Sequence, residues 1–250
     1  MAKWKPGAIM RYWVLAMPVL GLGNAGAVEY AEGHVGEVTL IVAQVDLQKE
    51  KLQLFLRDEH GQTYKSLDKL VSSVAAHGKS VQFAMNGGMF HPDFAPVGLY
   101  VADGVQLTPL NTQSGAGNFF LLPNGVFGIN AKGAFVVETA GYGKMAAGMT
   151  LATQSGPLLL RDGAIHPAFK PDSSSRLVRN GVCAPAPDRV ALVISNGPLN
   201  LYQFAQFFRD QLGCKDALYL DGNISSLYAP ALHRNDLRGE LGPIIVVTSE

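Results

Sequence analysis

Short hydrophobic runs, separated by polar turns that contain glycine or proline, recur along this chain. Most of the runs are rich in Val, Ile, Leu and aromatic residues, which is typical of β-strands. The pattern predicts strands at 38–45, 52–57, 81–85, 97–102, 105–108, 118–122, 126–130, 134–138, 150–155, 158–160, 177–182, 189–194, 217–220 and 244–248, with a proline-rich loop at 184–188.

Two segments instead carry apolar residues at helical spacing. Ser66 is the predicted N-cap of the first helix, which ends at Gly78. Asn200 is the predicted N-cap of the second, which ends at Gly213. We therefore expect a single α+β domain with a mixed β-sheet core, a β-meander between residues 97 and 138, and two main helices that pack on the core.

The second helix lies between two predicted strands, 189–194 and 217–220, and so belongs to a strand–helix–strand unit. In such units, binding sites form at the carboxyl ends of the strands. The strand at 217–220 ends on Asp221, which Gly222, Asn223, Ser225 and Ser226 follow closely. These residues predict a site at this strand end, although Asp-Gly-Asn is also a common turn sequence.

Composition limits the possible classes of protein. Of the 250 residues, 48% are hydrophobic and 16% are charged, so the chain has enough apolar side chains for a substantial core. The formal net charge is zero, and no basic run occurs beyond the N-terminus. We therefore do not expect a nucleic-acid partner.

The N-terminus has the pattern of a signal peptide. Three basic residues precede an apolar run at 12–23, and Ala25-Gly26-Ala27 is a cleavage site of small residues. We expect cleavage after Ala27, a mature domain at 28–250, and a periplasmic or secreted protein without membrane attachment. An uncleaved membrane anchor is the alternative, but the run is short for spanning a bilayer.

The sequence contains two cysteines, Cys183 and Cys214. Export leads to an oxidising compartment, where a disulfide between them is permitted. The alternative is two buried free thiols, which behave as small hydrophobic groups.

Four predicted strands end on small polar clusters: Asn86-Gly87-Gly88, Ser155-Gly156-Pro157, Asn180-Gly181 and Asp221-Gly222-Asn223. Glycines at strand ends allow a ligand to approach the backbone. Together with the nearby Arg176, Arg179, His91 and Asp93, these clusters predict one polar crevice. The sequence has no nucleophile elbow, P-loop, dinucleotide fingerprint or Cys/His metal motif, so we expect neither cofactor nor metal.

One combination of motifs resembles the phosphodiester glycosidase family, and most closely its exported bacterial branch: Asn86-Gly87-Gly88-Met89-Phe90, Ser155-Gly156-Pro157-Leu158, Arg179-x-Gly181 and Leu220-Asp221-Gly222-x-x-Ser225-Ser226, in this order. The resemblance covers roughly residues 86–248. It implies hydrolysis of the glycosidic bond in a sugar 1-phosphodiester, such as an N-acetylglucosamine-1-phosphodiester. The substrate would be a small molecule or a glycan phosphodiester of the cell envelope.

The resemblance also assigns roles to residues. A phosphodiester leaves as a stable anion, so the reaction needs a cation for the phosphate, hydrogen-bond donors for the sugar and a carboxylate for the oxocarbenium-like transition state. Asp221 is the expected carboxylate and Arg179 the expected phosphate ligand, with Arg176 second. His91 and Asp93 are acid/base candidates. The expected substrate-binding residues are Asn86, Gly87, Gly88, Ser155, Gly156, Arg176, Gly222, Asn223, Ser225 and Ser226.

One motif departs from the family pattern. The family commonly has three glycines after the aspartate, whereas Asn223 and Ile224 occupy the second and third places here. This departure leaves open an alternative, a periplasmic protein that binds glycans or phosphoglycans without turnover. If Ile224 fills the space that a sugar needs, sugar binding is altered or lost.

Overall fold

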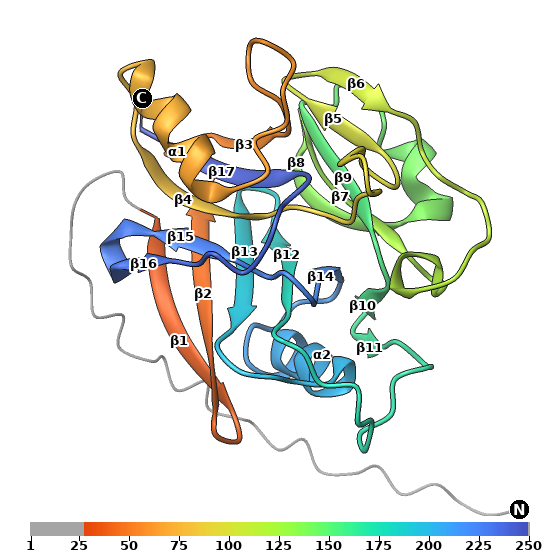
Figure 1. The fold of residues 1–250 in the computed structure, drawn as a ribbon. Coiled ribbons are helices and arrows are strands. Elements are labelled where there is room, and N and C mark those ends of the chain that lie inside the picture. The colour runs from red at the N-terminus through yellow and green to blue at the C-terminus, as the bar shows by residue number, and fades with distance from the viewer. Residues whose placement is uncertain (1–27, 250) are drawn as a thin grey trace, which may run out of the picture.

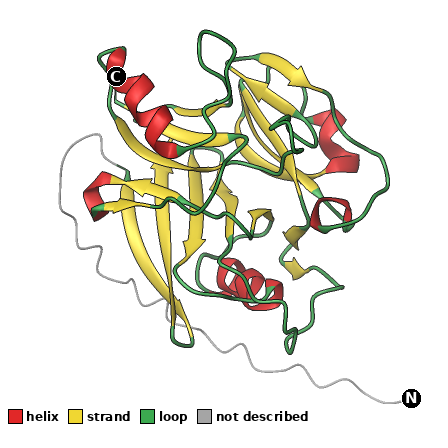
Figure 2. Cartoon of the chain, in the orientation of Figure 1, coloured by secondary structure: helices red, strands yellow, loops and turns green. Residues whose placement is uncertain are grey.

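The computed structural model describes residues 28–249, so the predicted signal peptide lies outside the described residues. Strands predominate and form three sheets, which two α-helices and three 3-10 helices accompany (Figures 1 and 2). The α-helices are α1 (Leu67–Ala76) and α2 (Leu201–Asp210), and the 3-10 helices are η1 (Asn118–Phe120), η2 (Thr139–Lys144) and η3 (Pro230–Leu232).

The largest sheet has seven strands. In spatial order they are β1 (Glu29–Val35), β2 (Val38–Asp46), β13 (Arg189–Ser195), β12 (Asn180–Ala186), β14 (Ala217–Asp221), β10 (Leu158–Arg161) and β11 (Ala164–Ile165). The second sheet, here called the β4 sheet, has the order β16 (Arg234–Asn235), β15 (Leu227–Ala229), β4 (Val81–Asn86), β17 (Ile244–Thr248) and β3 (Leu52–Phe55).

The third sheet, here called the β9 sheet, has the order β6 (Val105–Thr108), β5 (Tyr100–Ala102), β9 (Leu151–Ser155), β7 (Gly125–Asn130) and β8 (Gly133–Glu138). The predicted meander is therefore wrong in detail, because β9 inserts between β5 and β7. The predicted mixed sheet is also wrong: every strand pairing among residues 28–249 is antiparallel.

The main core lies between the sheets, and alternation along β2 shows how the layers form. Ile41, Ala43 and Val45 point into the core that the seven-stranded sheet shares with the other two sheets. Leu40 and Val42 point to the opposite face, where α2 packs. Burial of each valine, leucine or isoleucine side chain contributes about 1.5–3 kcal/mol. Helix α1 covers the outer face of the β4 sheet, so the layers run α2, seven-stranded sheet, β4 sheet, α1 (Figure 1).

The helix caps follow the sequence prediction. The side chain of Ser66 accepts a hydrogen bond from the amide of Lys69, and Asn200 forms a capping box with Gln203. The apolar stripe of α2 includes Phe204, Phe207 and Phe208, all of which are buried against the seven-stranded sheet.

Two local predictions are wrong, and the N-terminal strand was not predicted. Residues 118–122 form η1 and a turn instead of a strand, because Asn124 donates a side-chain hydrogen bond to Phe119 O. The region at 184–188 continues β12 into a hairpin, and the register shift between Cys183 and Ala186 accommodates its prolines. Strand β1, which pairs along its whole length with β2, was not predicted.

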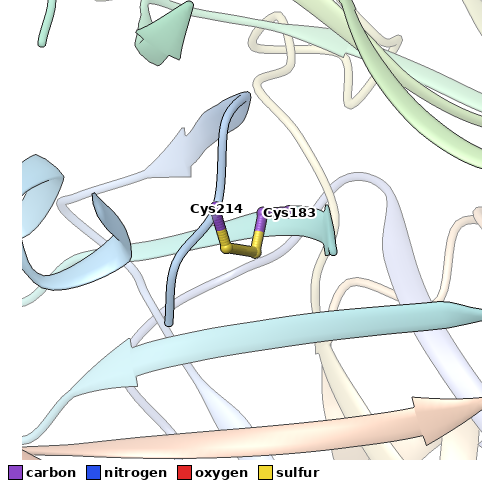
Figure 3. The surroundings of a disulfide bond; sticks show 2 residues. All are labelled: Cys183 and Cys214. Carbon is purple, nitrogen blue, oxygen red and sulfur yellow. A yellow bond between two sulfur atoms is a disulfide. The ribbon is translucent and has the colours of Figure 1, made fainter. Parts of the chain in front are cut away.

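The predicted disulfide between Cys183 and Cys214 is confirmed, and both cysteines are buried (Figure 3). Cys183 lies on β12 and Cys214 follows α2, so the bond ties the end of the helix to the sheet beneath it.

No helix in the described part of the chain is long and apolar enough to cross a membrane.

We expect removal of this disulfide to destabilise the protein. The bond closes a loop of 31 residues, for which the chain-entropy model gives roughly 3–4 kcal/mol. Cys183→Ala/Cys214→Ala should lower the free energy of unfolding, measured by urea denaturation, by about that amount. Titration of thiols in denatured, unreduced wild type should find none. Equal stability of the double variant and the wild type would contradict the prediction.

Candidate active site

The candidate site lies where three strands of the seven-stranded sheet meet one edge. Strands β13 and β14 both run antiparallel to β12, which separates them. The carboxyl ends of β13 and β14, Ser195 and Asp221, therefore lie at the same edge as Asn180, the first residue of β12. The predicted strand–helix–strand unit exists, with an antiparallel strand between its two strands.

A β-bulge sets the position of Asp221. Asn180 pairs with Asp221 and Gly181 pairs with Tyr219, so Leu220 is an extra residue in β14. Bulges of this kind re-aim a side chain and are frequent beside active sites. The bulge ends the regular pairing of β14 at the predicted carboxylate.

The carboxylate of Asp221 is half-buried and hydrogen-bonded to its own turn. Its Oδ1 accepts from the amides of Gly222 and Asn223, the latter at 3.0 Å, and the amide of Ile224 also contributes. Burial raises the pKa of Asp221 above its ordinary value, while these three amides oppose the shift. A carboxyl group with a raised pKa is suited to acid/base chemistry.

Two buried asparagines join the β4 sheet to this edge. Asn180 Nδ2 donates to the backbone oxygen of Asn86 at 2.7 Å and to Asn86 Oδ1 at 3.1 Å. The amide of Ser226 donates to Asn86 Oδ1 at 3.0 Å, and Ser225 Oγ donates to Asn180 Oδ1 at 3.2 Å. All four residues are at most 1% exposed. Their polar groups bind one another and hold the loop after Asp221.

The cluster that contains Ser155 and Gly156 is also joined to β14. Ser155 is fully buried, and its Oγ donates to Leu220 O at 3.1 Å, directly at the bulge. A Cβ on Gly156 would lie 2.6 Å from Asn124 Cβ, so this glycine permits close packing of the chain.

The cluster that contains Gly87 and Gly88 packs on β9. Thr153 Oγ1 donates to Gly87 O at 2.8 Å. Gly88 has a φ of +158°, and a Cβ there would lie 2.7 Å from Thr153 Oγ1. The four predicted clusters therefore do come together in the fold. Asn86, Ser155 and Ser225 nevertheless direct their hydrogen bonds at other protein groups.

Arg179 is 1% exposed, and its guanidinium is enclosed by protein acceptors. Nε donates to Leu199 O at 2.6 Å, Nη1 to Tyr219 Oη at 2.9 Å and Nη2 to Ser175 O at 2.9 Å. The guanidinium carbon lies 5.4 Å from the centre of the Tyr219 ring. Arg179 thus connects the loop before β12, the start of α2 and β14.

Gly222 packs directly against the buried side chains of Arg179 and Tyr219. A Cβ on Gly222 would lie 1.8 Å from Tyr219 Oη and 3.2 Å from Arg179 Nη1. The glycine of the Asp-Gly motif is therefore required by packing.

Arg176, in contrast, is exposed. Its Nη1 donates to Gln203 Oε1 at 3.0 Å, which places the guanidinium beside the first turn of α2. The helix dipole adds partial positive charge there. Both arginines therefore contact the N-terminal end of α2. Arg176 binds Gln203 in the first turn, and Arg179 donates to the backbone oxygen of Leu199, which directly precedes the helix.

His91 and Asp93 lie on an exposed loop after Gly88. Asp93 Oδ1 accepts from the amide of Ala95 at 3.0 Å, and Phe90 stacks on Phe94 with ring centres 5.5 Å apart. No hydrogen bond within residues 28–249 joins the side chain of His91 or Asp93 to the Asp221 turn.

The two residues that replace family glycines differ in environment. Asn223 is exposed. Ile224 is half-buried and packs on the apolar cluster under α1, which includes Leu67 and Leu241. A Cβ on Gly239 would lie 2.9 Å from Ile224 Cγ2. Ile224 therefore contributes to packing between the Asp221 turn and the chain before β17.

Sequence reasoning missed Tyr219 and Asn118. Burial raises the pKa of the Tyr219 hydroxyl, and the Arg179 charge opposes the shift. Asn118 also hydrogen-bonds this hydroxyl. Tyr219 stands two residues before Asp221 and could have been noticed, whereas nothing in the sequence connects Asn118 to this site. Residues 28–249 contain no group of three or more His, Cys, Asp or Glu residues that could hold a metal.

The architecture and the site together define a class of protein. Its antiparallel sheets carry a half-buried carboxylate at the end of a strand that has a β-bulge. A family model described as phosphodiester glycosidase matches residues 79–243. An Escherichia coli (strain K12) protein described as uncharacterized protein YigE is 34% identical over 191 residues, which cover 76% of this chain and 74% of that protein. The chain belongs to the phosphodiester glycosidase family, and the resemblance inferred from its motifs is confirmed.

Two solved structures share the fold. The catalytic domain of zebrafish N-acetylglucosamine-1-phosphodiester α-N-acetylglucosaminidase, auto-inhibited by its pro-peptide, matches with a TM-score of 0.63 at 15% identity, over 89% of this chain and 82% of that chain. A hypothetical protein from Synechocystis matches with a TM-score of 0.54 at 15% identity, over 89% of this chain and 62% of that chain.

We expect Gly222→Ala to destabilise the protein, because its methyl group would collide with Tyr219 Oη. Overpacking of this kind typically costs about 1–3 kcal/mol. Gly143→Ala is the matched control, since a Cβ at Gly143 meets nothing within 4 Å. Urea denaturation should show a lower free energy of unfolding for Gly222→Ala only. Equal effects of the two substitutions would show that Gly222 has no special packing role.

The raised pKa of Asp221 predicts a pH-dependent stability. The folded state binds the proton more tightly than the unfolded state, so this group lowers stability as the pH rises from the ordinary pKa of 3.8 through the raised value. Asp221→Asn removes the penalty and keeps an oxygen for the turn amides. The free energy of unfolding of the variant, relative to wild type, should increase over that pH window. A difference that is constant from pH 3 to pH 7 would contradict the prediction.

Proposed function

We propose that this protein hydrolyses the glycosidic bond of a sugar 1-phosphodiester in the cell envelope. The observation that carries the proposal is the Asp221 carboxylate, half-buried at a bulged strand end, held by turn amides and raised in pKa. Membership of the phosphodiester glycosidase family supports the same reaction. The disulfide supports an oxidising compartment, since such bonds are rare in reducing ones.

In the proposed reaction, the bond between the anomeric carbon and the phosphate oxygen breaks. The electron pair leaves with the phosphate as a phosphomonoester, and water adds to the anomeric carbon to give the free sugar. Asp221 either removes the proton of this water or stabilises the positive charge that develops on the sugar ring. The leaving phosphate is a stable anion and needs little protonation, so a second carboxylate is not required for its departure.

Arg176 is the better candidate for the phosphate cation. The Arg179 donors are directed at Leu199, Tyr219 and Ser175, so a substrate would have to displace protein acceptors from a buried charge. Displacement of this kind is costly. Arg176 is exposed, and its side-chain bond to Gln203 is easily exchanged for one to phosphate. In this proposal Arg179 is a positioning residue that holds Tyr219 beneath Gly222 of the Asp221 turn.

Asn223 is the residue of the turn that is best placed to donate to the sugar, because it is exposed and follows Asp221 by two residues. Asn86, Ser225 and Ser226 would act indirectly, because their hydrogen bonds hold the Asp221 turn in place. His91 and Asp93 would line the rim and contribute to the choice of aglycone.

The test is release of free N-acetylglucosamine from UDP-N-acetylglucosamine and from a methyl phosphodiester of N-acetylglucosamine. Asp221→Asn should lower kcat by about 10²–10⁴-fold, as for loss of an acid/base group. Arg176→Ala should raise KM with a smaller change in kcat, because the phosphate is bound in the ground state as well. Asp103→Asn is the control, a substitution of an exposed carboxylate in the turn between β5 and β6.

Turnover that survives in Asp221→Asn would refute the assigned role of this carboxylate. No turnover by wild type on either substrate would favour the alternative, a protein that binds glycans or phosphoglycans on the same fold. A melting-temperature screen against phosphoglycans would then identify the ligand, because a ligand of the folded state raises Tm.

A further inference from the structure

The chain between β16 and β17 packs against the Asp221 turn. A Cβ on Gly239 would lie 2.9 Å from Ile224 Cγ2, so this chain lies beside the last residue of the turn (Figure 1). Gly222, at the start of the turn, packs instead on the enclosed Arg179. The turn therefore meets the enclosed arginine at one end and the chain before β17 at the other.

Two anchors hold this chain, and the residues between them are exposed. At one anchor, the amide of Asp236 donates to Leu227 O at 2.9 Å, and Asp236 Oδ2 accepts from the amide of Leu227 at 3.0 Å. At the other, the amide of Leu241 donates to Lys65 O at 2.8 Å. Residues 237–240 lie between the anchors and are exposed. They are therefore held beside the turn, where they can contact a ligand.

Arg238 belongs to this exposed stretch, and its side chain has no hydrogen bond or ion pair within residues 28–249. The acidic residues on either side of it have other partners: Asp236 pairs with Arg234 at 2.7 Å, and Glu240 pairs with Lys65 at 3.6 Å. Each of the other arginines in the described range donates to a protein acceptor. The guanidinium donors of Arg238 are therefore available to an anionic ligand.

Arg176 and Arg238 lie near opposite ends of the turn. Ser175, which precedes Arg176, accepts from Arg179 Nη2 at 2.9 Å, and Gly222 packs on Arg179. Arg238 instead directly precedes the glycine that packs on the last residue of the turn. Both Arg176 and Arg238 are exposed, and one guanidinium fork matches one phosphate group. This arrangement favours a substrate that carries two phosphate groups.

We propose that Arg238 binds the second phosphate of a substrate in which the sugar is esterified to a diphosphate. The inference rests on the proposed function and names its substrate class. Arg176 would bind the phosphate attached to the anomeric carbon, and Arg238 would bind the next phosphate. Hydrolysis breaks the bond between the anomeric carbon and the oxygen of the first phosphate. Water gives its hydroxyl to the sugar, the electron pair stays on the diphosphate, and the remaining proton passes to the diphosphate or to solvent.

Release of N-acetylglucosamine from its methyl diphosphate and methyl phosphate diesters tests the proposal, because the two substrates differ by one phosphoryl group. Wild type should favour the diphosphate. Arg238→Gln should lower kcat/KM for the diphosphate about tenfold more than for the phosphate, as for loss of one charge-assisted hydrogen-bonded contact. Arg57→Gln is the matched control, an exposed arginine between β3 and α1, and should leave the ratio of the two kcat/KM values unchanged.

A second pair of variants separates a placed arginine from general attraction between charges. Ile224→Ala removes the contact with Gly239 but keeps every charge, so the preference for the diphosphate should fall. Ile224→Val keeps most of the contact and should retain the preference. A preference that Ile224→Ala and Arg238→Gln both leave unchanged would overturn the proposal. A melting curve for each variant shows that the folded protein was measured.

Calorimetric titration with the products, methyl diphosphate and methyl phosphate, tests the same inference without turnover. Wild type should bind methyl diphosphate more tightly, and Arg238→Gln should lose most of this difference. Absence of saturable binding of methyl diphosphate by wild type, or an equal loss of affinity for both products in Arg238→Gln, would overturn the inference. If wild type releases no sugar yet shows the expected binding, the proposed hydrolysis fails while the diphosphate site stands.

A nucleotide and a lipid can both carry such a diphosphate. The kinetic assay therefore also includes UDP-N-acetylglucosamine and farnesyl-diphospho-N-acetylglucosamine, each compared with the methyl diphosphate. The substrate with the higher kcat/KM identifies the source. Either source supports the proposal when Arg238→Gln lowers its kcat/KM as it lowers that of the methyl diphosphate, and a source whose kcat/KM does not depend on Arg238 contradicts it.

Discussion

The structure around Asp221 depends on the buried guanidinium of Arg179. A charge removed from water is tolerated only when its donors are satisfied, and Arg179 meets this condition with one acceptor from each of three segments. Burial lowers the pKa of Arg179, yet arginine remains protonated in proteins. The positive charge therefore fixes the start of α2, the loop before β12 and Tyr219 relative to one another. Gly222 is the residue that lets the chain pass over this assembly.

The site also shows that an antiparallel sheet can bring the carboxyl ends of two strands to one edge, as a parallel sheet does. Strands β13 and β14 are connected by α2 and run in the same direction, with β12 between them. Their carboxyl ends meet at one edge as they would in a parallel sheet. The Asn86–Asn180 pair then attaches the β4 sheet to this edge, so three strands of one sheet and one of another converge. Most polar residues of the motifs serve this attachment, which explains why they are buried.

Two β-bulges on strands of different sheets have the same effect. The bulge at Leu220 ends β14 at the carboxylate, and the bulge at Gln82 inserts an amide side chain at the start of β4. Each interrupts a ladder of backbone hydrogen bonds, and native sheets keep such interruptions where a side chain must be re-aimed.

Much of the fold follows from local patterns. The caps at Ser66 and Asn200, and most strands, are set by interactions within a few residues, which periodicity and turn chemistry record. The segment at 118–122 was misjudged because the hydrogen bond from Asn124 outweighs its apolar composition. Strand β1 was missed because its sequence is mostly polar and its pairing with β2 supplies the reason for its conformation. The disulfide was predictable because the chain offers two cysteines and one pairing.

The sequence by itself determined the caps, most strands, three of the four polar strand ends and the family motifs. The fourth predicted strand end, Asn180-Gly181, is instead the start of β12. Tertiary structure alone decided which of those polar groups can bind a ligand and which already have hydrogen-bond partners in the protein. Arg179 was expected to hold phosphate, but its partner Tyr219 is 40 residues away and encloses it. Asn86 binds Asn180 across 94 residues. Burial and the choice of hydrogen-bond partner depend on contacts between segments distant in sequence, and local patterns carry no record of them.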